Sequence, residues 1–157
     1  MQQSVNREGE QVNILISACL LGVHCRYDGQ ASVCPHLAQL QQHYQLIPVC
    51  PEILGGLPTP RPPAERLPDG RVVTREGKDV TAEYRSGAEQ ALALARKQGC
   101  VLAVLKERSP SCGRGRIYDG TFSRTLIPGS GVAAQLLEEN RIPVYGESQL
   151  EVLLDQM

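Results

Sequence analysis

The chain has 157 residues, 41% of them hydrophobic and 21% charged, which is the composition of an ordinary globular protein with room for one core rather than two. Its formal net charge is -1 and no basic run occurs, so the electrostatic footprint of a duplex-binding protein is missing and nucleic acid is not an expected partner. Because no signal peptide and no stretch of about 18 apolar residues occurs, we expect a cytoplasmic protein without a membrane partner.

The first part of the chain predicts a strand, a helix and a second strand. Residues 1–11 are polar and without periodicity, so we expect a flexible N-terminus followed by a single domain over residues 12–157. Val12–Ser17 is a nearly continuous apolar run, typical of a strand buried on both faces of a parallel sheet. Ala31–Gln45 carries apolar residues at spacings of three and four, which predicts an amphipathic crossover helix, and Leu46–Val49 is a second buried strand.

A proline-rich stretch, Pro51–Pro68, interrupts this alternation and predicts a stiff, extended loop. The dipeptide Asp69-Gly70, flanked by apolar residues, is a hairpin turn signal. Thr81–Gln98 then places small and apolar side chains on one helical stripe, and Gly99 is a suitable stop. Val101–Leu105 follows as a third buried strand.

The last part repeats the same pattern. Asp119-Gly120 is a second hairpin signal, and a helical pattern begins after Gly129-Ser130-Gly131. Ile142–Tyr145 predicts a fourth strand, and Ser148–Glu151 resembles a capping box that opens a final helix. Repeated strand–helix–strand units with right-handed crossovers predict an α/β single domain with a mostly parallel sheet flanked by helices, a Rossmann-like three-layer sandwich.

Three of the six cysteines fall where ligands bind in such a fold, beyond the carboxyl ends of the strands. Cys19 lies two residues after the first strand, Cys50 directly after the second, and Cys112 in the loop after the third. Three readings remain open from spacing alone: a shared metal site, buried packing, or one reactive thiol with unrelated neighbours. The compact C-x-x-C spacing that identifies zinc sites is missing.

The other three cysteines have different positions. Cys100 begins the third strand at the opposite edge of the sheet, so we expect buried packing, and Cys34 precedes a proline at a helix start and is also expected to be inert. Cys25 lies in the same loop as Cys19 and could be a fourth ligand, a resolving thiol or a bystander.

Two features near Cys19, Cys50 and Cys112 indicate ligand binding and proton transfer at this edge of the sheet. Cys112 lies in the small-residue loop Ser109–Gly115, which allows the backbone to approach a bulky ligand closely. Glu52 stands two residues after Cys50; its carboxylate is poorly suited to ligating a soft centre but well placed for proton transfer beside one. The alternative for Glu52 is a structural role, capping a backbone N–H group or pairing with Arg61.

At these positions the chain resembles the thiouracil desulfidase family, formerly a domain of unknown function. The resemblance runs in unbroken order from about Val12 to Tyr145 and rests on four co-ordered motifs. These are Ser17–Gly22, Cys25–Gly29, Val49–Glu52 followed by Gly55–Arg61, and Lys106-Glu107 with Ser109–Gly113. The similarity also passes through Asp79–Thr81, Tyr118–Phe122 and Gly129–Val132.

The resemblance implies an iron-sulfur enzyme that converts thiouracil to uracil without redox chemistry and releases hydrosulfide. In that family three cysteines hold a [4Fe-4S] cluster whose fourth iron stays open for the thiocarbonyl sulfur, and the matching ligands are Cys19, Cys50 and Cys112. Glu52 and Ser109 match the catalytic residues. For Ser109 a turn role before Pro110 is a competing interpretation, with Ser111 as the alternative serine.

Four other residues, His24, Arg26, Tyr27 and Lys106, are able to orient a small-molecule pyrimidine substrate. Two other functions also stay open. One is a non-catalytic iron-sulfur or zinc-binding redox sensor with Cys25 as a fourth ligand. The other is a metal-free sulfur transferase that uses a cysteine nucleophile and forms a persulfide.

Overall fold

The computed structural model describes residues 12–30 and 36–155, and its centre is a parallel sheet of four strands in the order β2-β1-β5-β8. The strands are β1 (Asn13–Ser17), β2 (Gln45–Val49), β5 (Ala103–Leu105) and β8 (Val144–Gly146). β1 pairs with β2 over its whole length, from Asn13 opposite Gln45 to Ser17 opposite Val49. Its other edge pairs with β5, and β5 pairs with β8. All four predicted strands are therefore present, and the mostly parallel sheet is confirmed.

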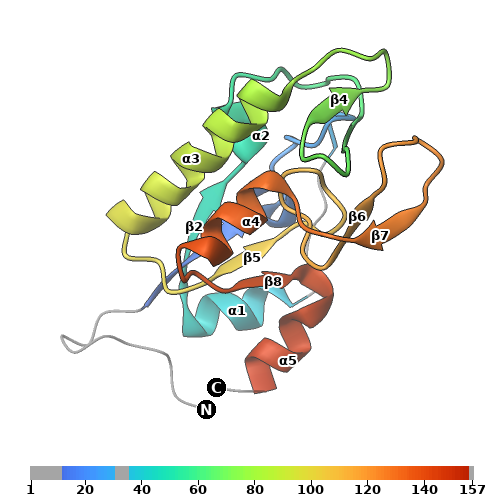
Figure 1. Cartoon of the computed structure of the whole chain (residues 1–157). Helices are drawn as coiled ribbons and strands as arrows, with labels where there is room; N and C mark the ends of the chain where they lie inside the picture. Colours follow the sequence, from blue (N-terminus) through green and yellow to red (C-terminus); the bar gives the residue numbers. More distant parts are fainter. Residues whose placement is uncertain (1–11, 31–35, 156–157) are drawn as a thin grey trace.

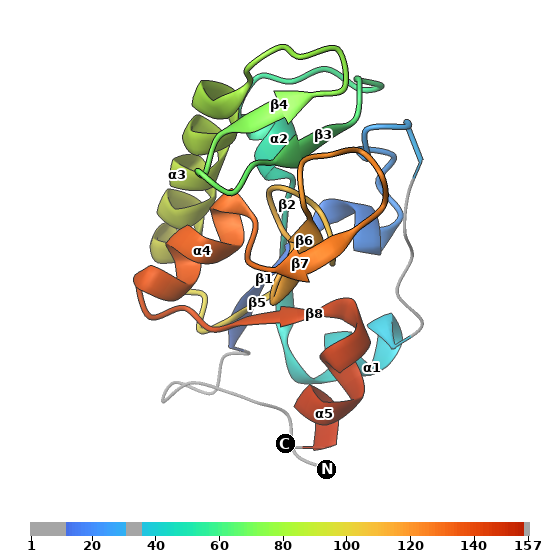
Figure 2. The same ribbon diagram turned by 45° about the vertical axis from the view of Figure 1, so that its right-hand side comes forward.

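Helices cover both faces of this sheet, as Figures 1 and 2 show. One face packs on α3 (Thr81–Lys97) and α4 (Val132–Glu139), the other on α1 (Leu37–His43) and α5 (Leu150–Asp155). The alternation of β1 explains the two cores, because Leu15 faces the α3 and α4 side while Ile14 and Ile16 face the α1 and α5 side. The three-layer α/β prediction is confirmed.

The prediction of one extended loop over Pro51–Pro68 is wrong at both ends of that stretch. Pro51 opens a short helix, α2 (Pro51–Leu54), because proline is favoured at the first helical position, where its missing N–H group is not needed. Near the other end, Ala64–Arg66 forms the strand β3, which pairs antiparallel with β4 (Val72–Thr74) around the predicted turn at Asp69-Gly70.

The second predicted hairpin is also present, with a longer connection than a two-residue turn. It consists of β6 (Arg116–Tyr118) and β7 (Leu126–Pro128), which pair antiparallel. The predicted capping box at Ser148–Glu151 is replaced by another arrangement: the short 3-10 helix η2 (Glu147–Gln149) precedes α5, and the Gln149 side chain accepts the Gly146 N–H at 2.7 Å. Ser148 instead donates to the carboxylate of Glu107.

The parallel register brings the carboxyl ends of the strands to one edge, where the chain leaves Ser17, Val49 and Leu105. Another 3-10 helix, η1 (Ala18–Leu21), continues directly from β1 at this edge. In the part of the chain that the structure describes, no helix is both long and apolar enough to cross a bilayer. The expected flexible segment 1–11 and Cys34 lie outside the described residues, and the expected domain boundary stays a prediction.

Candidate functional site

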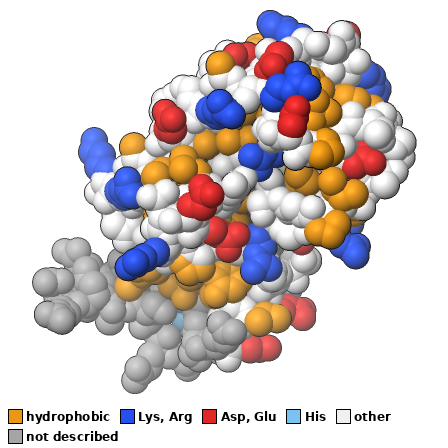
Figure 3. Space-filling model, viewed as in Figure 1, with side chains coloured by type: hydrophobic (Ala, Val, Ile, Leu, Met, Phe, Trp, Pro, Cys, Tyr) orange, Lys and Arg blue, Asp and Glu red, His pale blue; other side chains and the backbone are white. Residues whose placement is uncertain are grey.

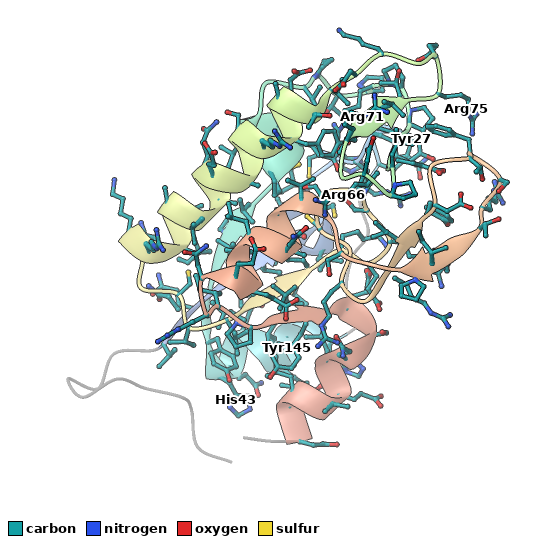
Figure 4. All side chains as sticks on the ribbon, in the orientation of Figure 1. Tyr27, His43, Arg66, Arg71, Arg75 and Tyr145 are labelled. Carbon is teal, nitrogen blue, oxygen red and sulfur yellow. The ribbon has the colours of Figure 1, made fainter. Side chains whose placement is uncertain are left out.

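A cavity of about 440 Å³ opens at the carboxyl edge of the sheet. The two small hairpins, β3–β4 and β6–β7, complete its walls, so residues far apart in the sequence share it. Tyr27 and Arg75, which both line the cavity, lie at one end of the molecule in Figure 4, whereas His43 and Tyr145 lie at the opposite end beside α1 and α5. On the face shown in Figure 3, Lys and Arg side chains are interspersed with Asp and Glu.

Four cysteines line this cavity: Cys19, Cys25, Cys50 and Cys112. Cys19 belongs to η1, Cys50 is the residue before α2, and Cys112 lies in the loop after β5. Cys19, Cys25 and Cys112 are buried and Cys50 is half-buried. The structure thus brings the predicted trio together and adds Cys25 to it. Cys100 is buried in the core at the other end of β5, as expected, and does not line the cavity.

Burial raises the pKa of three of these thiols, those of Cys19, Cys25 and Cys112, and so favours their protonated form in the metal-free protein. It raises the pKa of Cys19 to about 11, with the charge of Cys50 as the next cause, and the pKa of Cys25 to about 12, again with Cys50 second. The pKa of Cys112 is also raised, first by burial and then by the negative charge of Glu52. The mutual effects with Cys50 follow from the proximity of these sulfur atoms.

We expect the metal-free protein to lose stability as the pH rises above about 9. The folded state raises the pKa of Cys19 to about 11 and of Cys100 to about 11 from 9.0, so the unfolded chain releases these protons first. The stabilisation is complete below pH 9 and disappears as the pH passes through the folded-state values. Urea denaturation at pH 8 and pH 11 should show a fall of at least about 1 kcal/mol in the free energy of unfolding.

The Cys100→Ala variant is the control for this effect, because it removes one buried thiol outside the cavity. Its free energy of unfolding should fall less steeply between pH 8 and pH 11 than that of the wild type. A free energy of unfolding that stays constant or rises over this range would contradict the assignment.

Glu52 is held at the cavity by three side chains. Arg61 donates to its Oε2 from Nε at 2.8 Å and from Nη2, and Ser109 Oγ donates to its Oε1 at 3.2 Å. The Tyr84 hydroxyl also contacts Glu52, and its pKa is raised by burial and by the Glu52 charge, so it is a neutral donor. The structural alternative, an ion pair with Arg61, is therefore present, and it fixes the carboxylate in the cavity wall.

Ser109 has the turn role and also contacts Glu52, while its catalytic role stays a prediction. Its Oγ accepts the backbone N–H groups of Ser111 at 3.0 Å and Cys112 at 3.1 Å, which is a turn role, while its hydroxyl points to Glu52. Ser109 thereby links the carboxylate to the loop that carries Cys112. Ser111 is fully buried and does not line the cavity, which removes the support for it as the alternative serine.

Close packing of α2 on α3 places Glu52 beside Tyr84. A Cβ atom added at Gly87 of α3 would lie 1.8 Å from the Pro51 carbonyl oxygen, so only glycine permits this approach. The two helices meet along Gly55 and Gly87, and α2 is thereby held at a fixed height over the sheet edge. The position of Glu52 thus depends on a tertiary contact rather than on the stability of the four-residue helix itself.

Arg61 joins three segments of the cavity wall through hydrogen bonds of its guanidinium group. Its guanidinium also donates to the carbonyl oxygens of Cys25 at 3.0 Å and Pro58 at 3.1 Å. The Arg61 side chain is 5% exposed and that of Glu52 12%. Since removing one partner of a buried ion pair leaves an unpaired charge, Arg61→Met should lower the free energy of unfolding by about 3 kcal/mol in urea denaturation.

The exposed pair of Arg71 and Asp69 gives a matched control, since both side chains are more than half exposed. Arg71→Met should change the free energy of unfolding by less than about 1 kcal/mol. Equal losses in the two variants would show that Arg61 does not carry the structural role assigned to it.

Among the expected substrate-orienting residues, Arg26, Tyr27 and Lys106 line the cavity, whereas His24 does not. Lys106 Nζ is paired with Glu147 Oε1 at 2.9 Å. Tyr84 and Glu65 are among the cavity residues that the sequence did not single out. Tyr84 fitted the apolar stripe of a helix, and Glu65 lay within the stretch interpreted as a loop; neither has a local signal that separates it from a structural residue.

Within residues 12–30 and 36–155, no three His, Cys, Asp or Glu side chains are arranged to hold a single metal ion. The donor set of four buried or half-buried thiols remains chemically suited to a soft metal centre of larger size.

Comparison with known proteins gives three findings. The family model described as 2-thiouracil desulfurase matches residues 14–149. The uncharacterized protein YbbK of Bacillus subtilis (strain 168) is 41% identical over 150 residues, covering 90% of this chain and 99% of that protein. The solved structure of the [4Fe-4S]-dependent thiouracil desulfidase TudS is 47% identical, with a TM-score of 0.85, and the match covers 94% of this chain and 100% of that one.

Proposed function

Because the chain belongs to the 2-thiouracil desulfurase family, we propose that it is a [4Fe-4S]-dependent thiouracil desulfidase whose cluster is held by Cys19, Cys50 and Cys112. The observation that carries the proposal is the convergence of these three thiols on one cavity together with the fixed carboxylate of Glu52. The substrate is a small molecule, thiouracil or a related thiopyrimidine.

The cavity residues fit such a cluster. Each iron of a [4Fe-4S] cluster takes its own thiolate, so the cysteine ligands need not meet at one point. Three thiolates leave one iron for the substrate. Binding of the cluster must displace the protons of the buried Cys19 and Cys112 thiols, so loading should release protons.

The overall reaction replaces the sulfur of a C=S group by an oxygen from water and releases hydrosulfide, so it needs no external electrons. When bound, the cluster supplies a soft Lewis-acidic iron that binds and polarises the thiocarbonyl group. Glu52 accepts the proton of the attacking water and returns a proton to the substrate. Arg61 holds Oε2, and Oε1, to which Ser109 donates, has two lone pairs, so Oε1 can take this proton.

Anaerobic reconstitution with iron and sulfide, followed by incubation with 2-thiouracil or 4-thiouracil, tests the proposal. We expect the thiocarbonyl absorbance to disappear and hydrosulfide to accumulate in equal amount. The metal-free protein is the control and should be inactive. Desulfuration that survives chelation would instead indicate a metal-free reaction that uses a cysteine nucleophile.

A further inference from the structure

A second carboxylate, that of Glu65, faces the same cavity from another wall. Glu65 is the central residue of β3 and pairs with Val73 of β4. It is 8% exposed and lines the cavity, but it contacts none of the cysteines through a hydrogen bond in the described structure. The mechanism outlined above does not use it.

One oxygen of Glu65 holds the loop between β6 and β7. Its Oε1 accepts the backbone N–H groups of Gly120 at 2.9 Å and Phe122 at 3.1 Å. The loop lies tightly on the small hairpin, because a Cβ atom at Gly120 would come within 2.6 Å of Leu67 Cδ2, and Gly120 has a φ of 97°. Phe122, with a φ of 58°, then presents its ring to the cavity with the Arg75 guanidinium 5.7 Å from the ring centre.

The other oxygen of Glu65, Oε2, receives no hydrogen bond from the described residues, and Glu65 forms no ion pair with them. Glu52 differs, because Arg61 binds one of its oxygens and Ser109 the other. Oε2 is reached from the cavity, and a ligand that displaces water from a carboxylate oxygen must supply a donor in its place. Glu65 thus offers a fixed, unpartnered acceptor inside the cavity.

We propose that Oε2 of Glu65 accepts a hydrogen bond from the bound substrate, donated by a ring N–H group or by a hydroxyl group of an attached sugar. The inference rests on the proposed function and adds a substrate-binding residue to it. Both backbone donors meet the same oxygen, so the loop fixes the direction of Oε2 and selects substrates that carry a donor there. A ring nitrogen that lacks its hydrogen would meet the carboxylate as a second acceptor and be rejected.

The Glu65→Gln variant of the reconstituted holoprotein distinguishes the role of Oε1 in holding the loop from the role of Oε2 in binding substrate. Its amide oxygen can accept the Gly120 and Phe122 N–H groups and keep the loop in place, which leaves the NH₂ group where Oε2 stood. The NH₂ group of the variant then faces the N–H or O–H donor of the substrate, and no hydrogen bond can form between them. We expect the KM for thiouracil and the calorimetric Kd for the product uracil to rise about 10- to 100-fold, with an unchanged cluster absorbance. The Glu76→Gln variant, at an exposed position in the turn that follows β4, is the matched control and should behave as the wild type.

Changing the substrate tests the same hydrogen bond from the other partner. Methylation of both ring nitrogens of thiouracil should weaken binding to the wild type, and the Glu65→Gln substitution should weaken the binding of this methylated compound little further. A loss in Glu65→Gln with thiouracil identifies a ring N–H as the donor, whereas a loss confined to thiouridine identifies a sugar hydroxyl. Slow amide exchange at Gly120 and Phe122 in the variant verifies that the loop is intact.

Wild-type KM and Kd in Glu65→Gln for both thiouracil and thiouridine would overturn the inference while the desulfidase proposal stands. Equal weakening of wild type and variant by methylation would also overturn it, because the cost would then be steric. A reconstituted wild type that leaves thiouracil unchanged would instead defeat the proposed function, so the two failures are distinguishable.

Discussion

Replacing Cys50 by alanine is expected to abolish the brown chromophore of the reconstituted protein and to lower desulfuration by about 10³-fold or more. Cys50 follows β2 directly and lies in the cavity beside the other thiols, where it affects the pKa of Cys19, Cys25 and Cys112. A thiolate lost at this position leaves one iron without its protein ligand. Cys19→Ala and Cys112→Ala should have the same effect. The measurements are the iron content and the visible absorbance after anaerobic reconstitution.

Cys100→Ala is the matched control, because Cys100 is as buried as the cavity thiols but lies in the core at the other end of β5. This variant should keep its full iron content and chromophore. Retention of a complete cluster in Cys19→Ala, Cys50→Ala or Cys112→Ala would remove that residue from the ligand set.

Cys25→Ala tests the non-catalytic alternative. Cys25 lies close to Cys50, whose charge and side-chain hydrogen bond contribute to its raised pKa. If three thiols hold the cluster, Cys25→Ala should keep the chromophore. Loss of the cluster in this variant would indicate a fully ligated centre, in which no iron is open for a thiocarbonyl sulfur.

Replacing Glu52 by glutamine is expected to preserve the cluster but to lower kcat by about 10² to 10⁴-fold, the range for loss of a positioned general base. The amide oxygen can still accept from Arg61, which keeps the side chain in the cavity wall, whereas the NH₂ group takes the place of Oε1 and cannot accept a proton. Single-turnover desulfuration at equal cluster content is the decisive measurement.

Glu89→Gln, at an exposed position on α3, is the control for Glu52→Gln and should have wild-type turnover. Normal turnover in Glu52→Gln would rule out the proton-transfer role and leave Glu52 as the structural partner of Arg61 alone. A parallel loss of iron would point to the same conclusion, since the carboxylate would then act by maintaining the site.

Local sequence patterns determined the sheet and the position of the cysteines relative to it. Runs such as Val12–Ser17 are apolar on both faces, and parallel strands place their carboxyl ends together, so the convergence of Cys19, Cys50 and Cys112 followed from chain order alone. The motifs around these residues also indicated the family, which the comparisons confirm.

Only the tertiary structure decided which polar groups share the cavity and how they are paired. The contacts of Glu52 with Arg61, Tyr84 and Ser109, and of Glu65 with the β6–β7 loop, join residues up to 57 positions apart, and no local pattern encodes such pairs. The proline-rich stretch showed the same limit, because α2 and β3 form there through packing on α3 and β4. Backbone preferences and hydrophobic periodicity act over a few residues, whereas the direction of a buried side chain depends on every element packed around it.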